Sequence, residues 1–235
     1  KEANNLFSGI KKSLGRQKKV DVVICPPFVY LNSYKLQTTN YKLGAQDCFW
    51  EEKGAYTGEI SPSMLKDLGV SHVIIGHSER RKNLDETNEI VNKKIKQVLK
   101  SGLKAVFCIG ESERDEEGDY FNFLKEEIEE GLANIPKTLF KNLFIAYEPI
   151  WAISSNKNAK PDTPEELFQA VIFIRKILTE KIGKKLAFDI PVLYGGSVNS
   201  KNAKGFLDIE GVEGLLIGSA SLNVEKFKSI VDSLG

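Results

Sequence analysis

Short apolar segments alternate with amphipathic helical segments along the whole chain, and this alternation restricts the possible folds more than any other feature. The apolar segments are rich in β-branched residues and almost continuously hydrophobic, as expected of parallel strands buried on both faces. Repeated strand–helix units form either an open doubly wound sheet or a closed barrel. Seven strands are predicted, at residues 20–25, 42–46, 72–76, 104–109, 143–147, 190–194 and 213–218.

The predicted helices between these strands carry recognisable start and stop signals. Thr163 and Glu166 have the spacing of a capping box, and Gly183 is expected to end the helix that they begin. Asp85 is expected to begin, as its N-cap, the next helix, whose apolar side chains are Ile90, Val91, Ile95, Val98 and Leu99. Because no linker or low-complexity segment interrupts the series, a single domain over residues 1–235 is predicted.

The order of the elements favours a barrel over a doubly wound sheet. No GxGxxG motif follows the first predicted strand, as a Rossmann domain would require. The chain opens on an amphipathic helix and contains 235 residues, so it fits a TIM (β/α)8-type barrel, typically about 250 residues, that lacks its first strand in this sequence. Residues 20–25 and 213–218 would then be unpaired edges. They could close on each other, lie under the helix 1–14 or pair with another subunit; we expect a partly open barrel of low stability, with water or a neighbouring chain in the gap.

Composition excludes several classes of partner. Lys and Arg total 33 and Asp and Glu total 32, a net charge of +1 that favours neither a nucleic acid nor a membrane surface. No apolar stretch reaches the roughly 18 residues of a membrane span, and no signal-peptide pattern opens the chain. Cys25, Cys48 and Cys108 lack metal-ligand spacing, so they are expected to be reduced thiols of a cytoplasmic protein.

Reactive side chains directly follow two of the predicted strands. Glu148 comes after strand 143–147 and His77 after strand 72–76. Taken singly, Glu148 could be a carboxylate paired with a lysine, and His77 could be a helix-capping residue. In a barrel, however, the carboxyl ends of the strands carry the chemistry, so both residues are expected in one site. A helix N-terminus is expected to lower the pKa of His77.

Two glycine-containing junctions follow the last two predicted strands. They read LYGGSV at residues 193–198 and LLIGSASLN at residues 215–223. Backbone N–H groups in these loops of a barrel commonly bind phosphate. A phosphate site is therefore predicted next to the two reactive side chains.

Six segments resemble the triosephosphate isomerase family in the same order and spacing: AQDCFWEEKGAYTGEIS, GHSERR, VFCIGE, AYEPIWAI, YGGSVN and GLLIGSASL. The resemblance implies a cytoplasmic enzyme of glycolysis and gluconeogenesis. Its substrate would be a small phosphorylated triose, and it would interconvert dihydroxyacetone phosphate and D-glyceraldehyde 3-phosphate through an enediolate. No metal or organic cofactor is implied.

The resemblance also implies roles for individual residues. Glu148 would be the base that moves the proton, and His77 would polarise the carbonyl group. Ser78 would contact the base when the lid is open, Cys108 would lie buried beneath the site, and Glu79 would support it. The phosphate would be held by Ser154, Gly195, Gly196, Ser197, Gly218 and Ser219.

Residues 46–60 resemble the family's dimer loop, which inserts beside the active site of a partner subunit. Trp50 and Tyr56 make this short stretch unusually aromatic for an ordinary surface loop, and Thr57 lies near its tip. The resemblance therefore implies a homo-oligomer, a dimer or larger.

The sequence departs from the family pattern in two places. Residues 154–159 read SSNKNA where the lid of the family usually contains Gly-x-Gly-Lys, and serine has less backbone freedom than glycine. The family's first strand, whose asparagine and lysine bind substrate, is not present. If the chain begins at Lys1, activity is expected to be very low.

Two alternatives to an active isomerase are left open. One is a weakly active or inactive barrel that acts as a binding or assembly module, and the other is another phosphate-binding barrel enzyme that uses Glu148.

Overall fold

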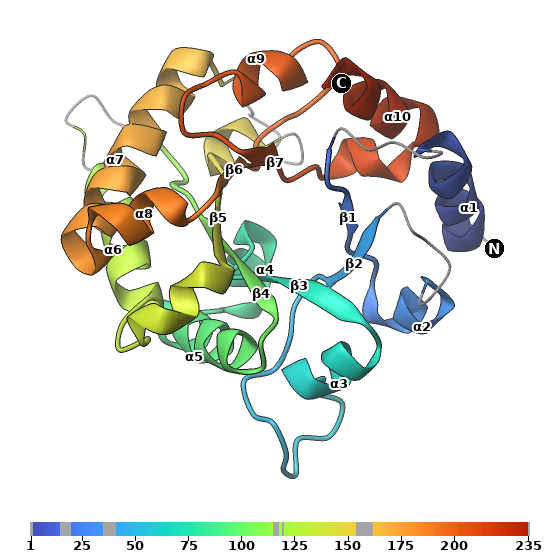
Figure 1. Ribbon diagram of the computed structural model, residues 1–235, viewed down its shortest axis with the longest axis horizontal. Coiled ribbons are helices and arrows are strands. Elements are labelled where there is room, and N and C mark those ends of the chain that lie inside the picture. The colour runs from blue at the N-terminus through green and yellow to red at the C-terminus, as the bar shows by residue number, and fades with distance from the viewer. Residues whose placement is uncertain are drawn as a thin grey trace.

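Seven parallel strands form a single curled sheet, with neighbours in sequence also neighbours in space. The computed structural model describes residues 2–14, 20–34, 41–114, 118, 120–153 and 162–234. Helices surround the sheet, so the predicted α/β barrel-type architecture is confirmed (Figure 1). The strands are β1 (Val23–Ile24), β2 (Lys42–Ala45), β3 (Val70–Ile75), β4 (Lys104–Ile109), β5 (Leu143–Tyr147), β6 (Val192–Tyr194) and β7 (Gly214–Leu215).

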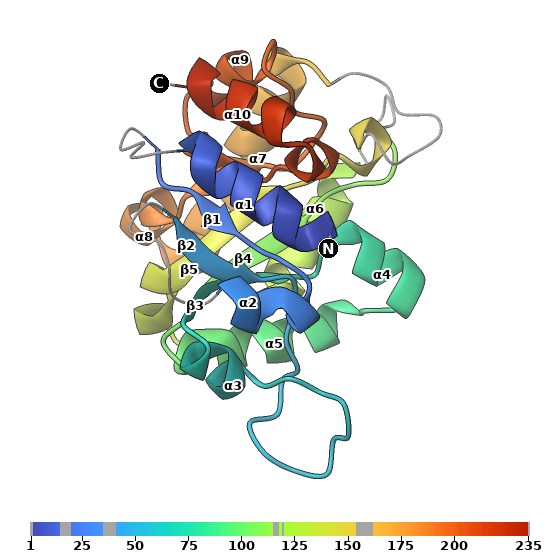
Figure 2. The ribbon, with the colours of Figure 1, turned by 90° about the vertical axis from the view of Figure 1, so that its right-hand side faces the viewer.

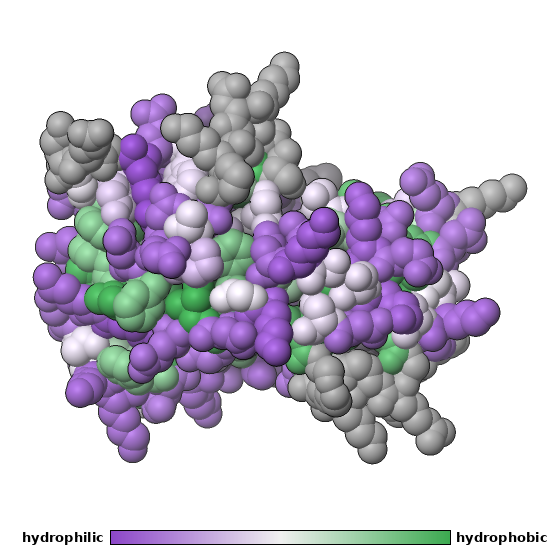
Figure 3. Space-filling view, turned by 90° about the horizontal axis from the view of Figure 1, so that it is seen from above, coloured by the Kyte–Doolittle hydropathy of each residue, from purple (hydrophilic) through white to green (hydrophobic). Residues whose placement is uncertain are grey.

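The helical layer is made of ten α-helices within the described ranges, and its outer face is mixed in polarity. Figure 3 shows a mainly hydrophilic surface with an apolar strip toward α7, whose Phe168 and Ile172 are exposed. No helix in the described part of the chain is long and apolar enough to cross a bilayer. The helices are α1 (Glu2–Leu14), α2 (Leu31–Tyr34), α3 (Pro62–Asp67), α4 (Ser78–Leu84), α5 (Asn88–Lys100), α6 (Tyr120–Gly131), α7 (Pro164–Ile182), α8 (Lys184–Asp189), α9 (Ala203–Leu207) and α10 (Val224–Ser233). Four short 3-10 helices are η1 (Phe28–Tyr30), η2 (Lys137–Asn142), η3 (Ile150–Ala152) and η4 (Ser219–Leu222).

The observed helix caps match the sequence prediction at α7 and differ from it at α5. The capping box of Thr163 and Glu166 begins α7 as predicted, and Gly183 ends it. The prediction for Asp85 was wrong: Asp85 ends α4 in the left-handed conformation, with φ of 52°. Thr87 instead caps α5, because its side chain accepts a hydrogen bond from the Ile90 N–H.

The core has two layers because side chains alternate across each strand. On β4, Phe107 points outward into the large cluster between the sheet and the helices. Val106 and Cys108, on the opposite face, pack inside the curled sheet against Ile74 and Ala146. Both faces of the central strands are thus buried, which explains why their sequences are continuously apolar.

The two edges of the sheet, β1 and β7, lie next to a pair of packed helices. Helices α1 and α10 lie side by side in Figures 1 and 2, and their apolar residues Ile10, Leu14 and Phe227 form one cluster with Val22. The open strand order agrees with the partly open barrel that we expected. The predicted strands at 20–25 and 213–218 were too long, because among the described residues each edge strand pairs on one side only.

His72 is a buried histidine at the amino end of the sheet. Its ring packs edge-on against Phe144, and its Nδ1 lies 2.8 Å from the Ser71 hydroxyl. Burial lowers the pKa of His72 to about 4, and the nearby charges of Lys104 and Lys42 add to this effect. The native state therefore holds this imidazole neutral.

We expect His72→Gln to reduce the loss of stability in acid. In the unfolded chain the histidine takes up a proton below its ordinary pKa of about 6.5, whereas the native state resists protonation down to about pH 4. The free energy of unfolding should therefore fall between these two pH values in the parent, and less so in the variant. Thermal unfolding of both chains from pH 4 to 7 measures this. Parallel curves would contradict it, since all other titrating groups are shared.

Candidate active site

Glu148 and His77 meet at the carboxyl ends of β5 and β3. The Glu148 side chain is only 2% exposed, and its Oε1 lies 3.0 Å from His77 Nε2. Its other oxygen, Oε2, accepts a hydrogen bond of 3.1 Å from the Ser78 backbone N–H. Because the Glu148 N–H donates to Ile109 O at 2.8 Å, the backbone of this residue is fixed to the end of β4.

His77 is the N-cap of α4, and its two ring nitrogens have different partners. Nδ1 accepts a hydrogen bond from the Glu79 N–H, so in the neutral ring the proton is on Nε2 and faces Glu148. Burial lowers the pKa of His77, but the hydrogen bond and charge of Glu148, with the charge of Glu79, outweigh it. The pKa of His77 is therefore raised, and the expectation that the helix N-terminus would lower it was wrong.

Two glycines touch Glu148 and leave no space for a side chain. A Cβ built on Gly110 would lie 1.8 Å from the Glu148 carbonyl oxygen. A Cβ on Gly195 would lie 2.8 Å from Glu148 Cγ. Cys108 is fully buried beside the carboxylate, and burial together with the charge of Glu148 raises the pKa of its thiol well above the usual value.

Of the two glycine loops predicted to bind phosphate, the loop after β6 touches this carboxylate through Gly195. Leu216 N donates to Tyr194 O at 2.8 Å, so the segments that follow β6 and β7 run next to each other. Gly195, Gly196 and Ser197 follow β6, and Gly218 and Ser219 follow β7 at the start of η4. Ser197 Oγ donates to Ala152 O at 2.7 Å and so ties this loop to η3. Ser154 and the lid residues 154–159 lie outside the described residues.

Glu111 forms a second buried polar centre, under η3. This role of Glu111 was not predicted from the sequence. It accepts hydrogen bonds from Tyr147 Oη at 2.7 Å and Trp151 Nε1 at 2.9 Å. Arg114 Nε lies 3.1 Å from the same oxygen, and its guanidinium packs against the Trp151 ring. The available signal was the position of Glu111, which follows a buried strand through a glycine, as His77 does.

The segment 46–60, predicted to be a dimer loop, projects away from the barrel (Figure 2). Phe49 stacks on Trp50 and Tyr56, with ring centroids 4.1 and 4.8 Å apart, and Thr57 is exposed. A buried ion network holds its base. In this network Asp47 pairs with Arg80 and Lys94, and both of these cations also contact Glu86.

No group of three or more His, Cys, Asp and Glu side chains in the described part of the chain could hold a metal ion. The residues gathered at the strand ends are instead a carboxylate, an imidazole and several backbone N–H groups. Such a set suits proton transfer on an anionic substrate.

Comparisons with known proteins agree with this chemistry. A family described as triosephosphate isomerase matches residues 1–234. The chain is 43% identical to the triosephosphate isomerase of Alkaliphilus oremlandii over 99% of its own length and 93% of the relative's. It is 46% identical to that of Citrifermentans bemidjiense, over 98% and 92% of the two chains. For Dictyoglomus thermophilum the identity is 45%, over 95% and 90%. The chain belongs to the triosephosphate isomerase family.

Proposed function

We propose that this chain interconverts dihydroxyacetone phosphate and D-glyceraldehyde 3-phosphate, with Glu148 as the base and His77 as the group that polarises the carbonyl. The observation that carries this assignment is the contact between the two side chains. A carboxylate that is 2% exposed lies 3.0 Å from an imidazole nitrogen at the carboxyl ends of two barrel strands. Membership of the family supports the same reaction.

In the proposed reaction, Glu148 takes a proton from C1 of the ketose and returns it to C2, and the hydroxyl proton on the C1 oxygen moves to the C2 oxygen through Nε2 of His77. The negative charge that develops on the substrate oxygen is stabilised by the His77 Nε2–H. The raised pKa of His77 depends on the charge of Glu148. Once Glu148 has taken the proton, that charge is gone, and burial, already the largest single influence on the pKa of His77, lowers this pKa against the charge of Glu79. His77 therefore acts as a neutral hydrogen-bond donor while the enediolate exists.

The phosphate group of the substrate is assigned to the two glycine loops. Gly195, Gly196 and Ser197 follow β6, and Gly218 and Ser219 follow β7. Backbone N–H groups in such loops bind a phosphate without a cationic side chain. Ser154 is proposed to join them from the lid. The link from Ser197 to Ala152 supports coupling between the phosphate loop and the segment that leads into the lid.

Glu148→Gln should abolish turnover while leaving substrate binding nearly intact. The amide keeps the size of the side chain but cannot accept the proton from carbon, and such general base catalysis is worth roughly 10²–10⁴-fold in rate. Turnover is measured with both triose phosphates, and binding of dihydroxyacetone phosphate by calorimetry. The exposed residue Glu225 supplies the control variant, Glu225→Gln, which should match the parent.

Two results would contradict the proposal. A Glu148→Gln variant that keeps most of its kcat would remove Glu148 from the mechanism. A parent chain that binds the triose phosphate but does not convert it would instead be the weakly active or inactive binding module.

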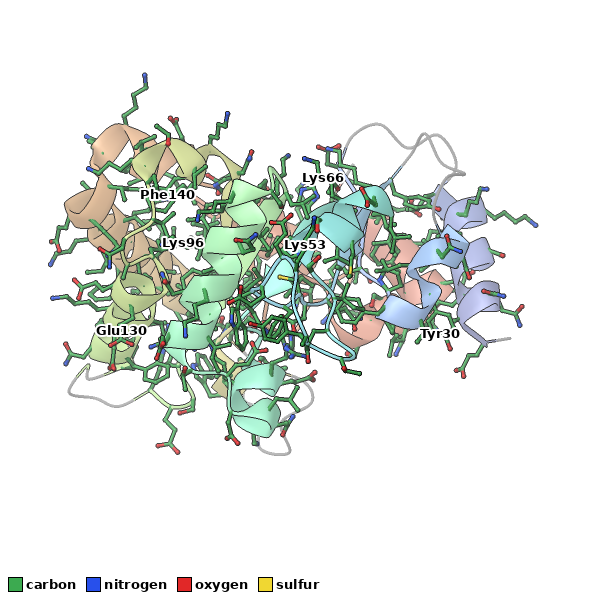
Figure 4. All side chains as sticks on the ribbon, turned by 90° about the horizontal axis from the view of Figure 1, so that it is seen from below. Tyr30, Lys53, Lys66, Lys96, Glu130 and Phe140 are labelled. Carbon is green, nitrogen blue, oxygen red and sulfur yellow. The ribbon has the colours of Figure 1, made fainter. Side chains whose placement is uncertain are left out.

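We further propose that the chain forms a homo-oligomer through the segment 46–60. Support comes from apolar side chains that are exposed on the loop itself, with Tyr56 at 45%, and on η1, with Val29 at 80% and Tyr30 at 38%. Figure 4 looks onto this side of the molecule, with Lys53 on the projecting loop and Tyr30 to one side. Exposed apolar groups of this kind are typical of surfaces that bind another protein.

Light scattering should give the parent chain at least double the 26.2 kDa of one chain. Tyr56→Asp should shift the mass toward a single chain at micromolar concentration, because it places a charge in the proposed interface. Phe123→Asp is the matched control, since the Phe123 ring on α6 is 47% exposed against 45% for Tyr56. A monomeric parent, or equal shifts in both variants, would refute this interface.

A further inference from the structure

A buried ion pair that the proposed mechanism does not use lies beneath the candidate active site. It joins Arg81 on α4 to Glu127 on α6, with Arg81 Nε 3.3 Å from Glu127 Oε1. The two side chains are 16% and 2% exposed. Replacing a buried ion pair by apolar residues of similar size is often neutral or stabilising, so stability alone gives little reason for charges at these positions.

The arginine holds the turn that orients His77. Arg81 Nε donates a hydrogen bond of 2.8 Å to the carbonyl oxygen of Gly76, the residue before His77. Gly76 has φ of +72°, and a Cβ there would lie 3.2 Å from Arg81 Nη2, so the guanidinium packs directly on this turn. Arg81 Nη1 also donates to Asn88 Oδ1 at 2.7 Å, which anchors the side chain to α5.

The glutamate holds the residue against which Glu148 packs. Glu127 Oε2 accepts a hydrogen bond of 2.8 Å from the Gly110 N–H. Gly110 is in direct contact with the Glu148 backbone, and the preceding carbonyl, Ile109 O, accepts the Glu148 N–H. A displacement of Gly110 would therefore displace Glu148 as well.

The electrostatics of Glu127 agree with a position close to the reacting carboxylate. The pKa of Glu127 is raised to about 7, mainly by burial and also by the charges of Glu148 and Glu111, against the opposing effects of Arg81 and the Gly110 N–H. Glu127 is thus close enough to feel the charge of Glu148. Its own described contacts are with Arg81 and the Gly110 N–H.

We propose that Arg81 and Glu127 are positioning residues, which together set the placement of His77 relative to Glu148. Each member of the pair holds the backbone behind one catalytic side chain, and the ion pair joins the two supports into one unit. The inference rests on the proposed function, since it assigns the pair to the same reaction.

The test compares Glu127→Gln and the double variant Arg81→Met/Glu127→Leu with the parent chain. The double variant leaves no buried charge without a partner, so it keeps the test valid where the single variant does not fold. A misplacement of about 1 Å can cost on the order of 100-fold in rate, so we expect kcat to fall about 10- to 100-fold. KM should stay within about twofold, because the glycine loops are not touched.

Glu213→Gln is the matched control for Glu127→Gln. Glu213 also accepts a backbone hydrogen bond, from Val192 N at 2.7 Å, and also pairs with an arginine, Arg175, at 2.9 Å. This pair lies at the opposite end of the strands, where β6 begins. Its loss should change the melting temperature and leave kcat within about twofold of the parent.

A second readout does not depend on turnover. The chain has two histidines, so NMR titration can follow His77, with His72 as an internal reference. The raised pKa of His77 requires its hydrogen bond to Glu148; the other charges acting on it are Glu79 and Arg80. In both Glu127 variants the pKa of His77 should fall, as it should in Glu148→Gln, while His72 stays unchanged.

These two readouts separate the possible failures. If the parent is inactive, the proposed isomerisation fails, and the titration of His77 alone decides whether the pair positions the two side chains. If the parent is active and the double variant keeps both its kcat and the pKa of His77, the ion pair is structural only and the inference is wrong.

Discussion

The burial of the Glu148 carboxylate is the constraint on which the rest of the site depends. Removing an ionised carboxylate from water costs several kcal/mol unless hydrogen bonds replace the water. Here the replacements are the Ser78 N–H and the ring of His77, both at the start of α4. One helix start therefore supplies these two donors, so the burial of the carboxylate depends on the position of α4 against β5.

Other buried carboxylates nearby are stabilised in a different way. Asp47, Glu86, Glu111 and Glu127 each face an arginine or a lysine. Within the part of the chain that the structure describes, Glu148 is the buried carboxylate whose ion-pair contact is a histidine. A permanently charged neighbour always favours the ionised form of a carboxylate, whereas an imidazole can give up or keep its proton as the charge of its partner changes. This difference separates Glu148 from the carboxylates that pair with arginine or lysine.

The sequence allowed the central strands and the placement of His77 and Glu148 at one end of the sheet to be predicted, because both depend on local pattern and on which strand ends face the same side. Strands β4 and β5 were predicted to the residue, since both of their faces are buried. The edge strands were overestimated because hydrophobicity does not report a missing neighbour. The roles of Arg81 and Glu127 were not foreseen, since 46 positions separate them and each lies in a helix whose pattern records burial but not its partner. Thr87 and Asp85 are both good capping residues, and the sequence did not indicate which of them would cap.

The two glycines that touch Glu148 have a consequence for anyone who wishes to transplant this chemistry. A design that copies Glu148 and His77 onto another barrel, without the two glycines, copies only part of the site. Because Gly110 and Gly195 press against the backbone and the side chain of the glutamate, the host must also supply two strand ends that carry no side chain. The two glycines contribute space, because a Cβ at either position would clash with Glu148. Most scaffolds fill such positions with a methyl group or more, and there the grafted glutamate would be pushed out of reach of the histidine.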